Sequence, residues 1–545
     1  MRAAHLPRRD TARLLASIAT MAVVLVSILL IGAAVDRDGV TRAAARTIRR
    51  PGGQSALVTI ASRAGTTAVP DAYLGLSTEY WALPVFERHS SLFEKVLALL
   101  HAQGDGPFVL RIGGDSADHT FWDPGARRLP PWVFQLTSAW LRRTATLVRQ
   151  TGVKLILDLN LITDAPLTAA RWAREADLNL PSGSVAGFEV GNEPDIYSRS
   201  YWRAETSRTS LFAGVLPHEI SPITYGRDFQ SYARALSRAA PGVPLLGPAL
   251  ANPYVDVNWI ASLLAGPHPG LGAVSAHRYP LSACVSPSSR SYPTIARLLR
   301  NRTTTLMAQS LVPAAQLAHR AGLPFRLTEL NSVTCGGRPG VSDAFATALW
   351  APDALFELLQ AGVDGVNVHV RAGTINAPFA LTDGGLDARP FLYGLILFAR
   401  TLGPDGQLVA VRVDATPGLH LKAWAVRVSP GGLHVLLIDK SAQSANVDLR
   451  LPAAGPATVQ RLLAPSAASR TGVTLDGQWL GRDGDWYGRP ADQIVRPGAT
   501  GYKVWIRGPS AALLSVRLQP EPPASAAAPR PAEPGAPILV AERVL

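Results

Sequence analysis

Between residues 73 and 370 the sequence alternates eight short apolar runs with segments of helical periodicity. The runs are nearly continuous in apolar residues, as strands are when a parallel sheet is covered on both faces. Intervening segments such as "SSLFEKVLALLHAQG" have apolar residues at helical spacing and end in a Gly that stops the helix. Eight such units predict a (β/α)8 barrel over residues 70–403. The predicted strands lie at 73–81, 107–114, 153–160, 187–193, 243–250, 272–279, 324–331 and 362–370.

The alternative fold for this pattern is a doubly wound open sheet. It is less favoured because no Gly-rich phosphate loop follows the first strand. After residue 403 the sequence pattern changes. Short runs of alternating apolar and polar residues are broken by Gly, Pro and Ser, which predicts an antiparallel β-sandwich over 404–518. Residues 56–69 precede the barrel and are expected to add a strand to that sandwich. Residues 519–545 are Pro/Ala-rich and are expected to form a disordered tail.

The N-terminal 35 residues combine a basic start with an uncharged apolar run of 22 residues, "LLASIATMAVVLVSILLIGAAV". That run is long enough to span a bilayer, and the basic flank places the N-terminus in the cytoplasm. A signal anchor is favoured over a cleaved signal peptide, for which the run is long. Under both alternatives the chain that follows this segment is exported. Residues 36–55 are rich in Arg, Ala and Gly and are predicted to form a linker.

The chain carries a formal charge of +13, but this does not predict a nucleic-acid partner. Of its 53 basic residues 48 are Arg, and nine of these lie in the first 50 residues against three Asp. No basic run with interleaved aromatic residues is present of the kind that nucleic-acid grooves use. Attraction of an anionic polysaccharide to a basic surface stays open.

Polar residues gather where the predicted strands end. In a (β/α)8 barrel these ends form the C-terminal face, where active sites lie. Two of them, Glu193 and Glu329, end strands four and seven on opposite sides of the barrel mouth. Hydrolysis of a glycosidic bond uses two carboxyl groups with separated pKa values, so this pair predicts a glycosidase. The other candidates at strand ends are Glu79, Arg111, Asp158, Asn160, Asn192, His277, Tyr279, Asn331, Asn367 and His369.

Neither a metal nor another cofactor is predicted. His277, His369 and Asp158 are potential ligands, but no HxH or HxxxH spacing occurs. Trp81 and Trp122 lie in strand-end loops, where they either pack in the core or line a sugar site.

The motifs "FEVGNEPD" and "TELNSVTCGG" resemble those of clan A glycoside hydrolases. Together with "LGLSTEYW", "LRIGGDSAD", "LDLN" and "SAHRYPLSAC" they look most like glycoside hydrolase family 79, the family of β-glucuronidases and heparanase. The resemblance covers about residues 56–518. It implies a retaining β-glycosidase in which Glu193 is the acid/base and Glu329 is the nucleophile, acting on a carbohydrate substrate.

The resemblance also implies roles for the surrounding residues. Asn192 is expected to contact the sugar 2-hydroxyl, Tyr279 to orient the nucleophile, and Arg111 to lie beneath it. His277 is expected to support the site. Glu79 and Asn160 stand where contacts to sugar hydroxyls are expected.

The sequence departs from the family where a uronate carboxylate would bind. A Tyr is expected shortly after the nucleophile, but Thr334 stands near that position, followed by Gly336 and Gly337. A second Tyr is not evident in the loop after strand eight. A uronic acid held by backbone amides and Arg371 and a neutral sugar both stay open. So does a catalytically silent, carbohydrate-binding barrel.

Cys284 and Cys335 are the two cysteines of the chain. In an exported protein such a pair predicts a disulfide, and the alternative is two unrelated buried thiols. The two residues lie in the loops after strands six and seven, which are neighbours in a barrel. A bond between them would brace Gly336 and Gly337 beside Glu329.

Overall fold

The computed structural model describes residues 53–61, 67–102, 105–122, 125, 133–163, 165–197, 220–451 and 455–518. The apolar segment predicted at 1–35, nearly all of the linker and the tail after 518 lie outside these residues. The helices and strands described below belong to one compact unit that begins at Gln54. None of the helices within the described ranges combines the length and apolarity needed to cross a bilayer.

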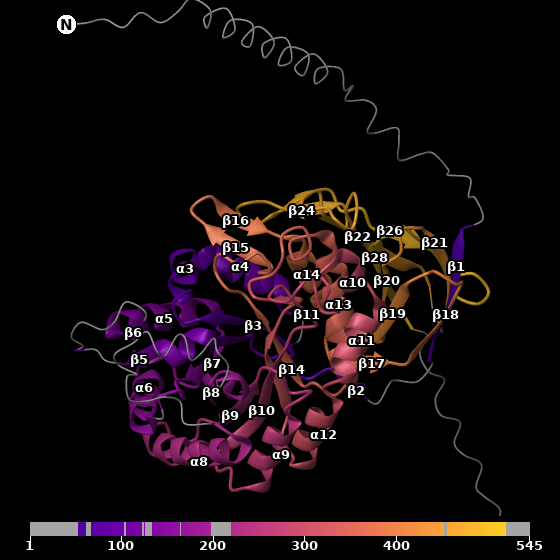
Figure 1. The fold of residues 1–545 in the computed structure, drawn as a ribbon. Helices are drawn as coiled ribbons and strands as arrows, with labels where there is room; N and C mark the ends of the chain where they lie inside the picture. Colours follow the sequence, from indigo (N-terminus) through magenta and orange to yellow (C-terminus); the bar gives the residue numbers. More distant parts are fainter. Residues whose placement is uncertain are drawn as a thin grey trace, which may run out of the picture. The chain divides into compact units, whose positions relative to one another are not determined.

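All eight predicted barrel runs form strands, and the predicted closed parallel barrel is confirmed (Figure 1). Each strand pairs in parallel with its neighbours, and the last pairs with the first through Val366 and Leu74. Because strand direction is shared, the carboxyl ends of all eight strands meet at one face. In barrel order the strands are β10 (Leu271–Arg278), β12 (Phe325–Leu330), β14 (Gly365–His369), β3 (Leu74–Glu79), β4 (Val109–Gly113), β7 (Lys154–Leu159), β8 (Val185–Val190) and β9 (Leu245–Leu250).

Helices connect the strands, and local signals set their ends. In α5 (Ser138–Thr151) the Thr137 side chain accepts from the Trp140 N–H, and Gly152 ends the helix at φ +68°. In α8 (Pro222–Ala239), Ser221 and Thr224 form a reciprocal capping box. The remaining helices are α3 (Leu83–Arg88), α4 (Ser90–Leu100), α6 (Pro166–Asn179), α9 (Val257–Ala265), α10 (Ile295–Leu298), α11 (Asn301–Gln309), α12 (Val312–Arg320), α13 (Phe345–Gln360) and α14 (Pro390–Leu402).

The C-terminal region is the predicted β-sandwich. One sheet has the order β18-β1-β21-β27, and the other contains β2-β17-β19-β20-β28-β22-β23-β24-β25, with β26 paired to β22. Val58, Val435 and Val447 are buried in the core that these sheets enclose. The strands are β1 (Gln54–Ile60), β2 (Thr67–Ala68), β17 (Gln407–Val409), β18 (Val411–Ala415), β19 (Leu421–Val428), β20 (Gly432–Asp439), β21 (Ala445–Arg450), β22 (Ala457–Leu463), β23 (Thr474–Leu475), β24 (Gln478–Leu480), β25 (Trp486–Gly488), β26 (Gln493–Val495), β27 (Tyr502–Ile506) and β28 (Ser510–Arg517).

The segment before the barrel forms β1 within the sandwich. It pairs antiparallel with β18 and parallel with β21, so that Val58 lies opposite both Val413 and Leu449. This strand is therefore internal to its sheet rather than an edge.

The barrel and the sandwich pack through α13 and α14, whose side chains are almost all buried. A buried ion pair crosses this boundary, because Lys440 of the sandwich bonds Asp353 of α13. The Trp424 indole N–H also donates to Asp353 at 3.0 Å. The two positively charged lysines nearby, Lys440 and Lys422, hold the pKa of Asp353 below its usual range despite burial. A buried pair of this kind fixes one packing arrangement, since breaking it leaves an uncompensated charge.

Four strand-end loops contain further short strands. The loop after β10 contributes β11 (Leu281–Ser282), which pairs in parallel with β13 (Val333–Thr334) from the loop after β12. The loop after β14 forms a hairpin of β15 (Phe379–Thr382) and β16 (Gly385–Ala388). A short parallel pair, β5 (Thr120–Trp122) and β6 (Phe134–Leu136), follows β4.

Candidate active site

Glu193 and Glu329 approach each other across the mouth of the barrel. Glu193 lies three residues after the end of β8, and Glu329 lies in β12. One carboxylate oxygen of each and one ring nitrogen of His277 form a group of atoms that all lie within 4.8 Å of one another. An approach this close suits a retaining glycosidase, whose carboxyl groups lie about 5–5.5 Å apart, better than an inverting enzyme, in which they lie roughly 6.5–9.5 Å apart.

The backbone places Glu193 in an unusual conformation. Its φ of +52° lies in the left-handed region, which costs a non-glycine residue about 1 kcal/mol or more. Its N–H donates to the Ala249 carbonyl on the neighbouring strand, and Pro194 begins a short 3-10 turn (Pro194–Ile196) immediately after it. The side chain thus leaves the strand direction at the point where the strand ends. Strain of this kind is tolerated where a functional side chain must be aimed.

Glu329 is surrounded by donors. The Tyr279 hydroxyl donates a short hydrogen bond to Oε1, and Arg111 Nη1 donates to Oε2 at 3.2 Å. His369 Nδ1 lies 3.4 Å from Oε2. Burial acts to raise the pKa of Glu329, but these groups and His277 outweigh it and lower the pKa to about 2.

His369 contributes less to the low pKa of Glu329 than its distance from that carboxylate implies. Burial lowers the pKa of His369 to about 4, so its ring is neutral at pH 7. At that pH the ionised form of Glu329 is therefore stabilised mainly by Arg111, by the Tyr279 hydroxyl and by His277. The carboxylate remains ionised across the whole neutral and mildly acidic range.

Glu193 is in the opposite electrostatic state. Burial raises its pKa to about 7, and the hydrogen bond from His277 Nδ1, at 2.9 Å from Oε1, opposes this only in part. The nearby negative charge of Glu329 adds to the increase. Between about pH 2 and pH 7 one carboxyl group is therefore protonated while its partner is ionised.

Arg111 organises the floor of the site. It is fully buried on β4, with Nε 2.8 Å from Glu189 Oε2 and Nη2 2.8 Å from Asp158 Oδ2. Nη2 also donates to Asn192 Oδ1 at 3.0 Å. This bond orients the Asn192 amide so that its oxygen faces Arg111 and its NH2 group remains the donor for a ligand. Arg111 therefore positions Asn192 as well as the carboxylate of Glu329.

Glu189 is a site residue that the sequence reasoning missed. It lies within β8 and not at its end, opposite Asp158 in the strand register. It accepts from Arg111 and, through Oε1, from the Thr328 hydroxyl at 2.7 Å. The available signal was a carboxylate inside an otherwise apolar barrel strand, which requires a buried partner.

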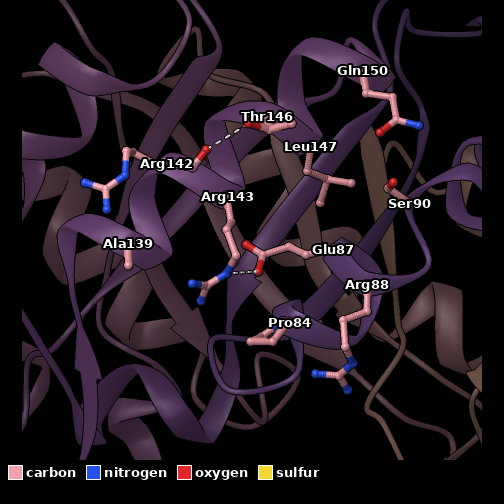
Figure 2. Close-up of a pocket in the computed structure, with 10 residues that line it drawn as sticks. All are labelled: Pro84, Glu87, Arg88, Ser90, Ala139, Arg142, Arg143, Thr146, Leu147 and Gln150. Atoms are coloured by element: carbon pink, nitrogen blue, oxygen red, sulfur yellow. Dashed lines mark hydrogen bonds and ion pairs between the residues drawn. The ribbon is translucent and has the colours of Figure 1, made fainter.

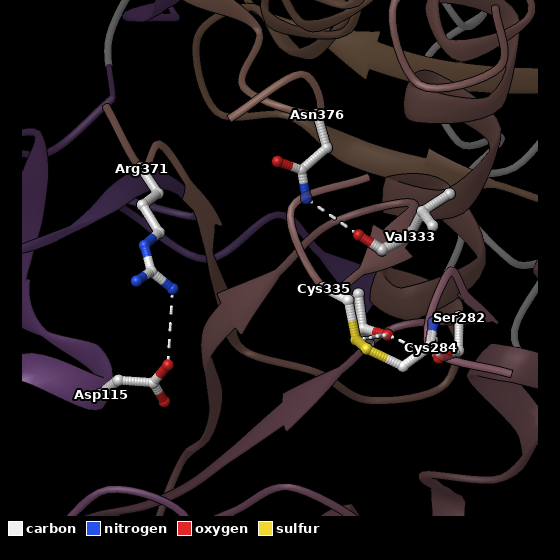
Figure 3. The surroundings of a disulfide bond; sticks show 8 residues. Asp115, Ser282, Cys284, Val333, Cys335, Arg371 and Asn376 are labelled. Carbon is white, nitrogen blue, oxygen red and sulfur yellow. Dashed lines mark hydrogen bonds and ion pairs between the residues drawn. A yellow bond between two sulfur atoms is a disulfide. The ribbon is translucent and has the colours of Figure 1, made fainter. Parts of the chain in front are cut away.

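A second group of charges lies at the ends of β3 and β4. Glu79 Oε2 accepts from the Ser116 N–H at 2.9 Å. Burial and the negative charge of Asp115 raise the pKa of Glu79 to about 7. Arg371, from the loop after β14, lies 3.4 Å from Asp115 Oδ2 (Figure 3). It lies 3.8 Å from Glu79 Oε1. Its guanidinium also lies 5.6 Å from the ring centre of the half-exposed Trp81.

Asn160 has contacts that give it a structural role. Its Nδ2 donates to the Asp118 carbonyl at 2.8 Å, and its Oδ1 accepts from the Thr163 hydroxyl at 2.8 Å. Trp122 stacks on Trp172 with ring centres 5.6 Å apart. Asn160 joins the loops after β4 and β7, and Trp122 packs the loop after β4 against α6. A contact between Asn160 and a sugar hydroxyl stays a prediction.

The predicted disulfide between Cys284 and Cys335 is present, with Cα atoms 6.0 Å apart (Figure 3). It lies next to the β11–β13 pair, so the loops after strands six and seven are joined twice. Gly337, at φ +91°, could not carry a side chain, because a Cβ there would lie 2.7 Å from Asn376 Cβ. The loop beside Glu329 is thus tightly packed against the loop after β14.

A separate surface cavity lies between α3, α4 and α5, away from the two glutamates (Figure 2). It has a volume of about 670 Å³, and its rim carries the Arg143–Glu87 ion pair at 2.9 Å. Arg88 and Arg142 also line the cavity. No strand-end residue contributes to it, so it is not the site of the carboxyl pair.

Comparisons of this chain with a family model and with known proteins point to the same family. Residues 423–513 match the family model described as the glycosyl hydrolase family 79 C-terminal beta domain. A β-glucuronidase of Aspergillus niger is 25% identical over 464 residues, covering 74% of this chain and 82% of the relative. The chain belongs to glycoside hydrolase family 79. It is therefore a glycoside hydrolase whose substrate is a carbohydrate.

Other matches to this family 79 chain are more distant. A β-glucuronidase of Neurospora crassa is 27% identical over 231 residues, covering 32% of this chain and 41% of the relative. A 4-O-α-L-rhamnosyl-β-D-glucuronidase from Fusarium oxysporum shares the fold, with a TM-score of 0.67 at 16% identity over 84% of this chain and 100% of that one. A GH51 arabinofuranosidase from Xanthomonas axonopodis shares it with a TM-score of 0.60 at 15% identity, over 85% of this chain and 100% of that one.

Proposed function

We propose that this family 79 chain is a retaining β-glycosidase of the β-glucuronidase type. The observation that carries the proposal is the pair of close carboxyl groups with opposed pKa values. Glu193, with a pKa of about 7, is protonated below neutrality and suits the general acid. Glu329, with a pKa of about 2, is ionised and suits the nucleophile.

The reaction follows two displacements. Glu329 attacks the anomeric carbon while Glu193 transfers its proton to the leaving oxygen, which forms a glycosyl ester and frees the aglycone. Glu193, now ionised, takes a proton from water, and that water releases the sugar from Glu329. His277, bonded to Glu193 at 2.9 Å, holds the acid in position through both steps.

Other residues position the substrate and the nucleophile. The Asn192 amide, fixed by Arg111, is suited to donate to the sugar 2-hydroxyl, a contact that strengthens in the transition state. Tyr279 donates to Glu329 and keeps one of its oxygens aligned. Glu79 stands within 3.8 Å of both His369 and Arg371 and is suited to a sugar hydroxyl.

The sugar we propose is a glucuronic acid. The curated relatives are both named β-glucuronidases, which supports it. The tyrosines expected for the carboxylate are absent, and the Gly337 N–H bonds the Thr334 carbonyl within its own loop. The Gly336 amide and Arg371 are the remaining groups suited to a carboxylate. Arg371 already faces two acidic residues, Glu79 and Asp115.

We also propose that the enzyme acts outside the cytoplasm. The apolar segment at 14–35 and the disulfide between Cys284 and Cys335 support export. Whether that segment anchors the enzyme in a membrane or is removed is tested by sizing the mature chain in membrane and soluble fractions.

The direct test is a panel of aryl β-glycosides with the wild type and Glu329→Gln. We expect hydrolysis of the glucuronide with retention of configuration, and loss of at least about a thousandfold in the variant, because a glutamine side chain cannot form the glycosyl ester. Thr328→Ser is a matched control, since its hydroxyl still reaches Glu189. A variant with wild-type turnover would exclude Glu329 as the nucleophile.

The same panel separates the two rival functions. Turnover of a glucoside or xyloside at a higher kcat/KM than the glucuronide would indicate a neutral sugar. Binding of a glycan without hydrolysis of any aryl glycoside from pH 3 to pH 8 would indicate a silent, carbohydrate-binding barrel. The opposed pKa values favour catalysis, since a binding protein gains nothing from a protonated Glu193 next to an ionised Glu329.

A further inference from the structure

A hairpin of the sandwich has two outward-facing aromatic rings that the proposed reaction does not use. The hairpin consists of β24 and β25, in which Trp479 lies directly opposite Tyr487. Residues opposite each other in antiparallel strands point to the same face, so these two side chains form a cross-strand pair. Their exposed fractions are 49% and 46%, although large aromatic residues usually bury most of their surface. We call Trp479 and Tyr487 the aromatic pair.

The other face of the hairpin packs onto the barrel. Leu480 and Trp486, the next cross-strand pair, point to that face because side chains alternate along a strand. The Leu480 N–H donates to the hydroxyl of Tyr393 in α14 at 2.8 Å. The Trp486 ring lies 6.0 Å from the Tyr393 ring, centre to centre. The hairpin is therefore attached to the barrel by its inner face, and the aromatic pair is not needed for that attachment.

Two glycines let the rings of the aromatic pair lie across the hairpin instead of standing upright. A Cβ at Gly488 would lie 3.0 Å from Trp479 Cζ3, and a Cβ at Gly481 would lie 2.3 Å from Tyr487 Cε2. Each ring thus reaches from its own strand over a glycine on the other side of the hairpin. Aromatic side chains cover glycines in β-sheets in this way. The backbone covers one side of each ring and leaves the other side to solvent, as the exposed fractions near one half indicate.

The surroundings of the aromatic pair offer hydrogen-bonding groups without an excess of charge. The Tyr487 hydroxyl donates to Asp483 Oδ2 at 2.6 Å, and the remaining lone pairs of the two oxygens are acceptors for a ligand hydroxyl. Residues 478–489 contain two arginines and two aspartates, so the hairpin has no net charge of its own. Attraction of a polyanion or of an anionic membrane is therefore not what this surface is built for.

A sugar ring has the chemistry that this surface suits. The C–H groups on one face of a pyranose carry a slight positive charge, and the face of an aromatic ring is electron-rich, so the two faces attract each other. The hydroxyl groups of the sugar lie around its edge, where the oxygens of Tyr487 and Asp483 accept hydrogen bonds. The two rings together offer one such stacking surface on each half of the hairpin.

Other occupants fit this surface less well. A stable protein–protein interface buries about 800 Å² on each partner, whereas glycines and exposed charged residues surround the aromatic pair. Aromatic residues that anchor a protein at a bilayer place their rings at the depth of the headgroups. Rings that lie across a hairpin do not extend into a bilayer in that way.

The hairpin lies next to a loop at the catalytic face of the barrel. The Leu386 N–H, in β16 of the loop after β14, donates to the Arg482 carbonyl at 2.7 Å. On the barrel side, Lys95 of α4 donates to Asp485 at 2.7 Å. The loop after β14 also contains Arg371. A glycan held at the aromatic pair is therefore kept beside the loops that border the two glutamates.

From these contacts we infer that the aromatic pair binds pyranose rings of an uncharged polysaccharide, at a site separate from the two catalytic glutamates. The inference goes beyond the proposed hydrolysis and does not depend on it, because binding at the sandwich requires no bond cleavage. Such a site keeps the enzyme on a glycan while the barrel acts on a glycosidic bond nearby.

The test compares variants of the full-length enzyme. Trp479→Ala removes one ring of the aromatic pair, and Trp479→Phe keeps a ring that reaches Gly488. The matched control is Trp505→Ala, because Trp505 is also an exposed tryptophan of the sandwich but lies opposite Asn446. Binding is measured by depletion of the protein from solution with insoluble cellulose, β-1,4-xylan and β-1,3-glucan. Folding is followed by circular dichroism, and kcat/KM is measured for 4-nitrophenyl β-glucuronide.

We expect wild type and Trp505→Ala to bind at least one of the three polysaccharides equally, and Trp479→Ala to bind it roughly tenfold more weakly. Trp479→Phe should lose less than about threefold, because it keeps an aromatic face. Wild-type affinity should change by less than about twofold between 0.1 and 1 M salt, since stacking is not screened by ions. The kcat/KM of Trp479→Ala for the small glucuronide should stay within about twofold of wild type, because the hairpin is distant from the carboxyl pair.

Several results would overturn the inference. Absence of wild-type binding to all three polysaccharides would show that the pair is not a glycan site, and equal weakening in Trp479→Ala and Trp505→Ala would show unspecific adsorption. Equal losses in Trp479→Ala and Trp479→Phe would exclude stacking as the contact. Polysaccharide binding that Trp479→Ala leaves unchanged, with weaker binding to phosphatidylcholine vesicles, would assign the pair to a lipid surface. A wild type that binds polysaccharide but hydrolyses no glucuronide would refute the proposed function and leave this inference standing.

Discussion

Replacing Tyr279 by Phe removes one hydrogen bond to the nucleophile and leaves every charge in place. The Tyr279 hydroxyl donates to Glu329 Oε1, and burial together with Glu329 raises the pKa of Tyr279, so the donor stays protonated at all relevant pH values. A hydrogen bond to an ionised group contributes about 1.5–3 kcal/mol. Because one pKa unit corresponds to about 1.36 kcal/mol, the pKa of Glu329 should rise by about one to two units, from about 2 to about 3–4.

The sign of the effect on activity follows from the role of each carboxyl group. Glu329 acts when ionised, so raising its pKa moves the acidic limb of kcat/KM to higher pH. Glu193 acts when protonated and sets the alkaline limb near pH 7, and the substitution leaves its surroundings unchanged. Above pH 5 Glu329 is ionised in both proteins, whereas near pH 3 the variant loses a further factor of about two to ten from protonation.

The assay is kcat/KM for an aryl β-glucuronide from pH 2.5 to pH 8, with folding followed by circular dichroism at each pH. Tyr292→Phe is the control, because Tyr292 contacts Arg338 through its ring. Its profile should superimpose on that of the wild type. A ratio of wild-type to Y279F activity that stays constant from pH 3 to pH 6 would refute the assignment of Tyr279 as the group that lowers the pKa of Glu329. A shift of the alkaline limb instead would assign Tyr279 to the acid.

Two further predictions follow from the same contacts. Glu193→Ala should lower kcat/KM by about a hundredfold to ten-thousandfold for poor phenolic leaving groups and far less for 2,4-dinitrophenol, which needs no proton, and equal losses for both would exclude Glu193 as the acid. The double variant Cys284→Ser/Cys335→Ser removes a crosslink between positions 51 residues apart. It should lower the free energy of unfolding, measured by denaturant titration, by up to about 4 kcal/mol. An unchanged denaturation midpoint would show that the β11–β13 pair alone holds the two loops together.

The barrel could be predicted because each of its strands is a distinct apolar run bounded by helical segments. The same reasoning placed Glu193 and Glu329 together, since strand ends in a parallel barrel share one face. It missed Glu189 because attention to strand ends overlooks side chains that point inward from mid-strand. The buried contacts of Arg111 with Glu189 and Asp158 could be predicted only from the strand register, because in that register Asp158 lies opposite Glu189.

The sandwich was harder to predict in detail. The strands from β22 to β27 follow shorter and less regular patterns than the rest of the sandwich, such as "ATVQRLL" at 457–463. β22 pairs with β28, and β27 pairs with β21, so tertiary context decides their conformation. The β15–β16 hairpin carried a usable signal, because "LTDGG" contains the Asp-Gly pair typical of tight hairpin turns.

Asn160 shows what the position of a residue in the sequence leaves open. It occupies a strand end, as the sugar-contacting residues do, but the two carbonyls and the hydroxyl around it engage its amide. Sequence position identifies which face a residue lies on. The neighbours that compete for its hydrogen bonds are visible only in the folded loops.

The placement of β1 has a consequence for how the chain is made. Val58 emerges from the ribosome long before Val413 and Leu449, its partners on either side. Until those residues are synthesised, an apolar strand has exposed edges on both sides, which is the condition under which chains associate wrongly. The barrel can close during this interval, but the sandwich cannot. A fragment containing only the C-terminal strands would lack the strand between β18 and β21, so the two ends of the polypeptide must be produced together to give a soluble enzyme.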